Sequence, residues 1–169
     1  MNMHFRTAWS DYFPGTSPTT PLSPKEYNER QTVSNTNFYV SNCLFSECTS
    51  TSNGGALYCS SITRLLIEST SFFSCKTSAR NGGAIHAHNS NSEGCVLYAV
   101  CGNDCYSTYA SDPSFQFATT EVKNLASIKN YINYSSIVRC VSENSNSLQI
   151  LFLYYGKVCC PSVNISMNK

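Results

Sequence analysis

Hydrophobic and polar residues in this chain follow a twelve-residue pattern that occurs five times. The blocks span residues 37–48, 64–75, 94–105, 129–140 and 157–168, so their starts lie 27, 30, 35 and 28 residues apart. The fourth position holds Val40, Ile67, Leu97, Ile132 and Cys160, and the ninth holds Phe45, Phe72, Gly102, Ile137 and Ile165. The last position holds Cys48, Cys75, Cys105, Cys140 and Asn168. A repeat of this length is typical of solenoids, in which stacked units share one core.

Within each repeat the apolar spacing is that of short strands rather than helices. Two strands fall inside the block, and a third lies between blocks, as GGALYC at 54–59 and GGAIHA at 82–87. Weaker counterparts of the third strand are SFQFA at 114–118 and SLQILFL at 147–153. Three short strands per repeat, separated by Gly, Asn and Ser turns, predict an all-β fold, a parallel β-helix of about four coils plus the start of a fifth.

The two glycine-containing strands can be aligned residue by residue. Leu57 then falls on Ile85 and Cys59 on Ala87, and we expect these side chains to face the interior. Tyr58 and His86 fall on the opposite face, where we expect them to be exposed. The pairs Gly54–Gly55 and Gly82–Gly83 are expected to let the chain turn sharply into each strand, because glycine tolerates positive φ.

Residues 1–36 have a different composition, with four of the six prolines at Pro14, Pro18, Pro21 and Pro24 among Ser and Thr. This predicts an irregular, linker-like segment before a repeat domain at 37–169. The aromatic residues Trp9, Tyr12 and Phe13 either cap the first coil or belong to a disordered tail. No secretory signal is evident at the start, and no cap closes the last repeat, so we expect a fragment of a longer solenoid.

Composition excludes some classes of function. Charged residues make up 12% of the chain and the formal net charge is +1, which disfavours nucleic-acid binding. No apolar run approaches the roughly 20 residues of a membrane span.

Ten cysteines indicate either disulfides or small buried side chains. Because four of them occupy one repeat position, we expect a structural role. Side chains in register on parallel strands point the same way, which suits a ladder of mostly free thiols in place of an asparagine ladder.

Two segments resemble a known repeat. Phe45-Ser-Glu-Cys48 followed by Asn53-Gly-Gly-Ala-Leu57, and Phe72-Phe-Ser-Cys75 followed by Asn81-Gly-Gly-Ala-Ile85, are similar to the alternating F-x-x-N and G-G-A-I motifs of polymorphic outer-membrane proteins. Cys-rich β-helix surface proteins of parasitic protists carry similar repeats. The resemblance covers about residues 37–168. It implies a right-handed parallel β-helix and a role in adhesion or antigenic variation at a cell surface, and an extracellular or surface location, although this chain has no evident signal peptide or anchor.

Catalytic and metal-binding patterns are weak. His86-x-His88 precedes Cys95, Cys101 and Cys105, but strong zinc signatures contain two closely spaced pairs, so no metal or cofactor is expected. Cys59 and His86 fall on opposite strand faces, which disfavours Cys–His catalysis. Glu47 and Asp104 share one repeat position two coils apart, slightly too far for a pair of hydrolytic carboxylates, with Ser74 between them.

The sequence therefore favours a non-enzymatic surface adhesin or interaction scaffold that binds a host-cell protein or glycan. The alternatives are a glycan-active β-helix enzyme, either a polysaccharide lyase or a hydrolase, and a truncated paralogue without a function of its own. The expected contact residues are Tyr58, His86, Tyr98, Tyr134, Tyr154 and Tyr155. Asn133 and Asn164 lie in N-glycosylation sequons, which matter only in a secreted chain.

Overall fold

The chain winds through stacked parallel sheets, as a computed structural model of residues 8–22, 24–34, 37–109, 114–142 and 149–168 describes it. Sheet A contains β1 (Thr20–Leu22), β4 (Asn37–Ser41), β8 (Arg64–Glu68), β12 (Gly94–Tyr98), β16 (Lys129–Asn133) and β19 (Lys157–Cys159). Sheet B contains β2 (Glu26–Tyr27), β5 (Leu44–Ser46), β9 (Ser71–Phe73), β13 (Cys101–Asn103), β17 (Ser136–Val138) and β20 (Asn164–Ser166). Sheet C contains β3 (Gln31–Ser34), β7 (Leu57–Ser60), β11 (Ile85–His88), β15 (Phe115–Glu121) and β18 (Gln149–Tyr154). A small sheet D contains β6 (Thr49–Ser50), β10 (Lys76–Thr77) and β14 (Tyr106–Ser107).

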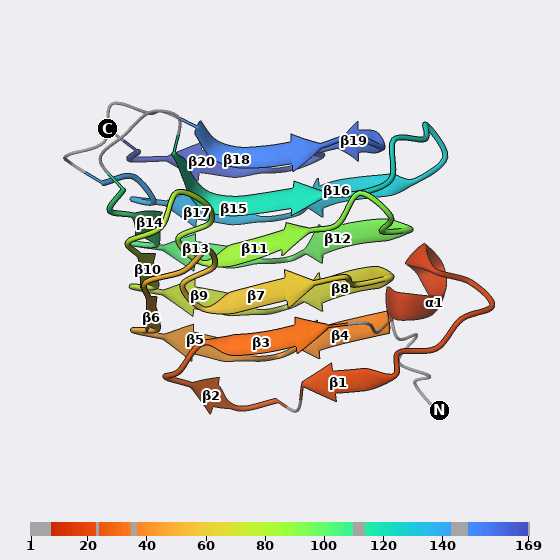
Figure 1. Cartoon of the computed structure of the whole chain (residues 1–169), viewed down its shortest axis with the longest axis horizontal. Coiled ribbons are helices and arrows are strands. Elements are labelled where there is room, and N and C mark those ends of the chain that lie inside the picture. Colours follow the sequence, from red (N-terminus) through yellow and green to blue (C-terminus); the bar gives the residue numbers. More distant parts are fainter. Residues whose placement is uncertain (1–7, 23, 35–36, 110–113, 143–148, 169) are drawn as a thin grey trace.

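Each passage of the chain through sheets A, B and C is one coil, and successive coils add one parallel strand to each sheet (Figure 1). The all-β, parallel-stranded prediction is thus correct. The first coil, β1 to β3, was not predicted, because its residues lie in the proline-rich segment that the sequence assigned to irregular structure. β1, β2 and β3 pair with β4, β5 and β7. The repeat therefore begins one coil earlier than residue 37.

The predicted repeat positions stack directly on one another in the interior. Val40 pairs with Ile67, Ile67 with Leu97, and Leu97 with Ile132. In the ninth position, the rings of Tyr27, Phe45 and Phe72 form a stack with centroid separations of 5.0 and 4.9 Å. The next member of this column is Gly102, and the ring of Phe117 from sheet C fills the space beside it. A Cβ atom on Gly102 would lie 2.3 Å from that ring.

The chain bends between sheets A and B, and again after sheet B, at residues with left-handed backbone. The first bend uses Asn42, Ser69, Ala99, Tyr134 and Ser162, and the second uses Glu47, Ser74, Asp104, Arg139 and Met167, with φ between 47° and 56°. This conformation costs an L-residue roughly 1–2 kcal/mol. Such a bend persists only if the neighbouring structure holds it in place.

The residues at the last position of the repeat form hydrogen bonds at the second bend. Cys48, Cys75, Cys105 and Cys140 are fully buried, and all ten cysteines of the chain are free thiols. The backbone N–H of Cys75 donates to Sγ of Cys105 at 3.3 Å, and that of Cys105 donates to Sγ of Cys140 at 3.4 Å. The N–H of Cys140 donates to Oδ1 of Asn168. The thiols thus occupy the structural position of an asparagine ladder, as the sequence predicts.

The glycine pairs serve two different purposes. Gly54 and Gly82 have φ of 75° and 66°, as expected for a sharp turn. Gly55 and Gly83 instead lie where the backbone of the next coil comes too close for any side chain. A Cβ on Gly55 would be 2.1 Å from the carbonyl oxygen of Gly83. The pairs therefore form part of the coil packing as well as its turns.

Helix α1 (Ala8–Tyr12) packs against the outer face of sheet A. Trp9 and Phe13 are buried there, so the aromatic segment does fold back on the repeat. It covers the side of several coils rather than the end of the first one (Figure 1).

Candidate functional site

The outer face of sheet C carries two columns of side chains that point away from the core. Strand alternation and parallel register align Thr32, Tyr58, His86, Thr119 and Phe152 in one column, and Ser34, Ser60, His88, Glu121 and Tyr154 in the other. The interior partners Leu57, Cys59, Ile85 and Ala87 are buried, as predicted. Figure 1 shows these strands, β3, β7, β11, β15 and β18, stacked side by side.

Flat rings stack along the first half of this face. The Arg30 guanidinium lies 4.7 Å from the ring centroid of Tyr58, a cation–π contact. The rings of Tyr58 and His86 stack with centroids 5.5 Å apart and planes 4° apart. His86 and His88 stack in the same way at 5.7 Å and 3°. Arg30 is fixed in place because its Nε and Nη2 donate to the carbonyl oxygens of Gly54 and Asn53, both at 2.8 Å.

A second ring cluster lies at the C-terminal end of the same face. Phe115 stacks on Phe152 at 4.1 Å, Phe152 on Tyr154 at 5.3 Å, and Tyr154 lies 3.9 Å from Tyr155. Tyr154 and Tyr155 are exposed. The face therefore offers ring surfaces at both ends.

An imidazole and a carboxylate lie close together between the two ring clusters. Nε2 of His88 is 2.8 Å from Oε2 of Glu121, and the side chain of His88 is 54% exposed whereas that of Glu121 is 7% exposed. Among the described residues of this face, Nδ1 of His86, Oγ1 of Thr119 and Oε2 of Glu121 are buried polar atoms without a hydrogen-bond partner, so the His88–Glu121 contact is close but does not have hydrogen-bond geometry. Burial, then the neighbouring His88 and Arg30, lower the pKa of His86 to about 4, so its imidazole is neutral near pH 7.

The prediction that His86 is exposed is wrong. It does lie on the outer face of the strand with Tyr58, but its exposed fraction is 6%, because the rings on either side cover it. Burial of this kind depends on neighbours from other coils and from the same strand. Tyr58 is partly exposed, in line with its prediction.

The six predicted contact residues separate into two groups. Tyr58, His86, Tyr154 and Tyr155 belong to the sheet C face. Tyr98 and Tyr134 lie elsewhere, at the end of β12 and in the bend after β16, with ring centroids 5.6 Å apart.

Sequence reasoning placed His88 on one strand face with His86, but it did not identify Arg30, Glu121, Phe115 or Phe152 as part of this face. Arg30 lies in the unpredicted first coil. Glu121 could have been found from the alternation along β15, which aligns Thr119 and Glu121 with His86 and His88. The positions of Phe115 and Phe152 are harder to find, because the register between β15 and β18 is irregular from Phe115 to Ala118.

The two sequons have different environments. The side chain of Asn133 is buried, and its Nδ2 donates to the hydroxyl of Tyr12 at 3.0 Å, so the folded chain leaves no room for a glycan there. Asn164, in β20, is exposed. Only Asn164 is therefore accessible to modification in this fold.

Other candidate chemistry is not assembled in the described residues. They contain no group of three or more His, Cys, Asp or Glu side chains that could hold a metal ion. Oδ2 of Asp104 accepts a hydrogen bond from Ser74 at 2.9 Å and lies 3.4 Å from Nζ of Lys76. This carboxylate therefore contacts side chains of the preceding coil rather than Glu47. Burial raises the pKa of the Cys95 thiol to about 12 and also raises that of Cys59, which leaves both thiols protonated and weakly nucleophilic.

The chain matches no family model, no curated protein and no solved structure. The resemblance to polymorphic outer-membrane protein repeats therefore stays a prediction from the motifs. Within the described part of the chain, no helix has the length and apolar character needed to cross a membrane.

Proposed function

We propose that this chain is a non-enzymatic recognition protein of the cell-surface type, a right-handed parallel β-helix that binds a host-cell protein or glycan through the outer face of sheet C. The observation that carries the proposal is the presence of two stacked ring clusters on that face, one around Tyr58 and His86 and the other around Phe152 and Tyr154. Aromatic rings present flat, rigid contact area at low entropic cost, and their faces suit both protein side chains and the C–H surfaces of sugars. The right hand is supported by the strong chirality of connections between parallel strands of one sheet.

The polar groups of the face suit recognition of a ligand with hydroxyl or carbonyl groups. Ser34, Ser60 and His88 lie in the column next to the rings, and both Ser34 and His88 are exposed. The ionisable side chains Arg30 and Glu121 already contact other side chains of the face, Arg30 the ring of Tyr58 and Glu121 the imidazole of His88. A ligand held by ring contacts and neutral hydrogen bonds is the best fit, and a neutral glycan or a polar peptide surface meets this description.

The proposal is tested by binding of the full chain to immobilised glycans and to host-cell surfaces. We expect Tyr58→Ser and Tyr154→Ser each to weaken binding about tenfold, because each removes an aromatic contact of about 0.5–1.5 kcal/mol together with the apolar area that the ring buries. The matched control is Tyr134→Ser, which removes a more exposed ring from a different face. Equal losses in all three variants, or none in the first two, would contradict the assignment of this face.

The alternative of a glycan-active enzyme rests on one observation, the pairing of the buried Glu121 carboxylate with His88 beside the rings. A carboxylate–imidazole pair can move a proton to or from a bound sugar. If this alternative is correct, the chain releases reducing ends or unsaturated sugars from polysaccharide, and Glu121→Gln abolishes the release while binding persists. Binding without product release in the unmodified chain supports the recognition function.

A further inference from the structure

The outer face of sheet A contains apolar side chains that a solenoid exposes only at a cost. Tyr39, Leu66, Val96 and Tyr131 form one outward column across four coils. Leu66 and Val96 are fully buried although they point away from the core. They form a second, separate apolar cluster with Trp9 and Phe13 of the N-terminal segment, whose side chains cover them.

The N-terminal segment contributes its aromatic rings from one side of a single helical turn. Trp9 and Phe13 are four residues apart, so they share a helix face, and their ring centroids are 4.9 Å apart. The ring of Trp9 lies 6.1 Å from that of Tyr39, and the ring of Tyr12 lies 6.1 Å from that of Tyr98. Through these rings and the buried side chain of Leu66, the segment contacts the second, third and fourth coils, and its polar contacts extend to the fifth.

The sheet provides a shaped site for this segment. Gly94 leaves the space that the Phe13 ring occupies, because a Cβ on Gly94 would lie 2.6 Å from Cε1 of Phe13. Nζ of Lys129 donates to the backbone carbonyl of Tyr12 at the end of the helix, and Nδ2 of Asn133 donates to the Tyr12 hydroxyl. Oδ1 of Asn133 is buried without a partner among the described residues. The space beside Gly94 and the two polar contacts match this face to the segment, and the face is called the groove from here on.

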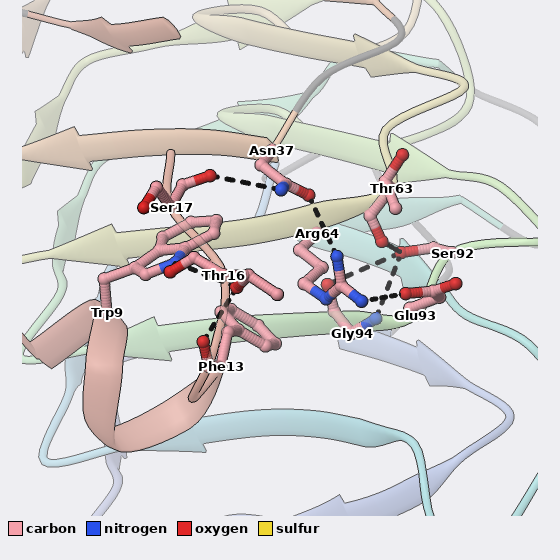
Figure 2. Close-up of polar contacts among 10 residues, drawn as sticks. All are labelled: Trp9, Phe13, Thr16, Ser17, Asn37, Thr63, Arg64, Ser92, Glu93 and Gly94. Carbon is pink, nitrogen blue, oxygen red and sulfur yellow. Dashed lines mark hydrogen bonds and ion pairs between the residues drawn. The ribbon is translucent and has the colours of Figure 1, made fainter. Parts of the chain in front are cut away.

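The connection between the segment and sheet A is short, because β1 begins at Thr20 and pairs with β4. The indole N–H of Trp9 donates to the Thr16 carbonyl at 3.1 Å, which closes the segment on itself (Figure 2). Asn37 of β4 contacts the end of the segment, because its Nδ2 donates to the Ser17 carbonyl at 3.1 Å while its Oδ1 accepts from Arg64 (Figure 2). The Asn37 N–H also donates to Oγ1 of Thr19 at 3.1 Å. Gly15 has a φ of 73°, and its surroundings are open. A five-residue helix is not stable alone in water, so α1 acquires its structure on the groove.

We propose that the outer face of sheet A is a binding groove for a short helical segment with aromatic residues at positions i and i+4, and that α1 is its intramolecular occupant. A partner segment with the same aromatic spacing and a free carbonyl at its C-terminal end competes with α1 for the groove. Covalent attachment gives α1 an effective concentration in the millimolar range, so the groove opens only to a strong or locally concentrated competitor. The site is independent of the sheet C face, because it lies on a different sheet.

The single tryptophan of the chain, Trp9, reports directly on the groove. The full-length Phe13→Ser chain weakens the intramolecular contact, and the probe is a synthetic peptide of residues 8–19 in which phenylalanine replaces Trp9. We expect the peptide to displace the protein's own segment, with a saturable shift of Trp9 emission to longer wavelength and greater acrylamide quenching. The matched control peptide has serine at both aromatic positions, and we expect it to bind at least about tenfold more weakly, because it lacks both of the rings that the face buries.

Far-UV circular dichroism establishes that the Phe13→Ser chain is folded. If it is not, the unmodified chain with millimolar peptide gives the same measurement through acrylamide quenching of Trp9. Displacement by the aromatic peptide and not by the serine peptide supports the proposal. Absence of displacement in a folded chain overturns it, and so does binding of fluorescein-labelled peptide that leaves Trp9 emission unchanged, because the peptide then binds elsewhere.

Discussion

At the scale of single residues, the last column of the repeat shows how a thiol takes the place of an amide. Asn168 accepts the N–H of Cys140, and its Nδ2 donates to the carbonyl oxygens of Ile137 and Ser166 at 3.2 and 2.7 Å. Cys105 accepts the N–H of Cys75 and donates to the carbonyl of Asn103 at 3.3 Å. Both side chains satisfy backbone groups at a left-handed bend, which explains why this column tolerates both residue types.

This equivalence predicts different outcomes for two substitutions of Cys105. Cys105→Ala leaves the buried N–H of Cys75 without an acceptor, and we expect it to lower the free energy of unfolding by about 1–3 kcal/mol. Cys105→Asn restores an acceptor and donors in similar volume, so we expect a smaller loss. Urea unfolding under reducing conditions measures both. If alanine is tolerated as well as asparagine, the thiol column only fills space.

The buried imidazole of His86 predicts a dependence of stability on pH. In the folded chain its pKa is lowered to about 4, whereas in the unfolded chain it returns to 6.5. Between these values the unfolded state binds more protons, so stability rises with pH. The stabilisation is fully present above pH 6.5 and is lost as the pH falls toward 4, by up to about 3 kcal/mol. Unfolding free energies of the unmodified chain and of His86→Phe, which keeps the ring stack, measure this effect. An equal slope in both chains over this range would show that His86 is not its source.

At the scale of elements, two sheets share one aromatic column. The stack of Tyr27, Phe45 and Phe72 in sheet B is interrupted at Gly102, and Phe117 of sheet C enters the gap with its ring 6.1 Å from that of Phe72 and nearly perpendicular to it. The glycine and the phenylalanine are complementary, because one gives the volume that the other needs. The coil is therefore held together across its interior as well as along its strands.

This complementarity predicts strong coupling between the two positions. Gly102→Ala places a methyl group against the Phe117 ring, and we expect it to cost about 1–3 kcal/mol through overpacking. In a Phe117→Ala background, which itself costs about 3–5 kcal/mol, the same change becomes neutral or favourable because a cavity is available. A double-mutant cycle by urea unfolding measures the coupling. Additive effects would mean that Phe117 relaxes away from Gly102 freely.

At the scale of the whole molecule, the repeat was predictable wherever apolar residues recur at the same positions of successive blocks. The blocks from residue 37 on, and the pairing of Leu57 with Ile85, follow directly from apolar spacing. The first coil was missed because Pro21 and Pro24 indicate irregular structure, although Leu22 and Tyr27 continue the same columns. The sheet C face was only half predicted, since the burial of His86 and the alignment of Glu121 with His88 depend on neighbours brought together by different coils.

The helix on sheet A changes how the whole solenoid is expected to unfold. In a linear repeat, each coil is stabilised by its immediate neighbours, so a substitution acts locally. Helix α1 instead contacts side chains of four coils, from Tyr39 of the second to Lys129 and Asn133 of the fifth. Contacts of this range link coils that otherwise do not touch, and they favour opening of the coils as one unit.

Hydrogen exchange measures this coupling. In Trp9→Ala we expect amide protection to fall together in β4, β8, β12 and β16, because the cover of all four strands is weakened at once. The comparison is Ile137→Val, a core change that costs about 0.5–1.5 kcal/mol in one coil. We expect it to lower protection in β17 and its neighbours β13 and β20, with β4 unchanged. If Trp9→Ala affects only β4, next to the Trp9–Tyr39 contact, then α1 is a local patch on the second coil, and the coils open independently.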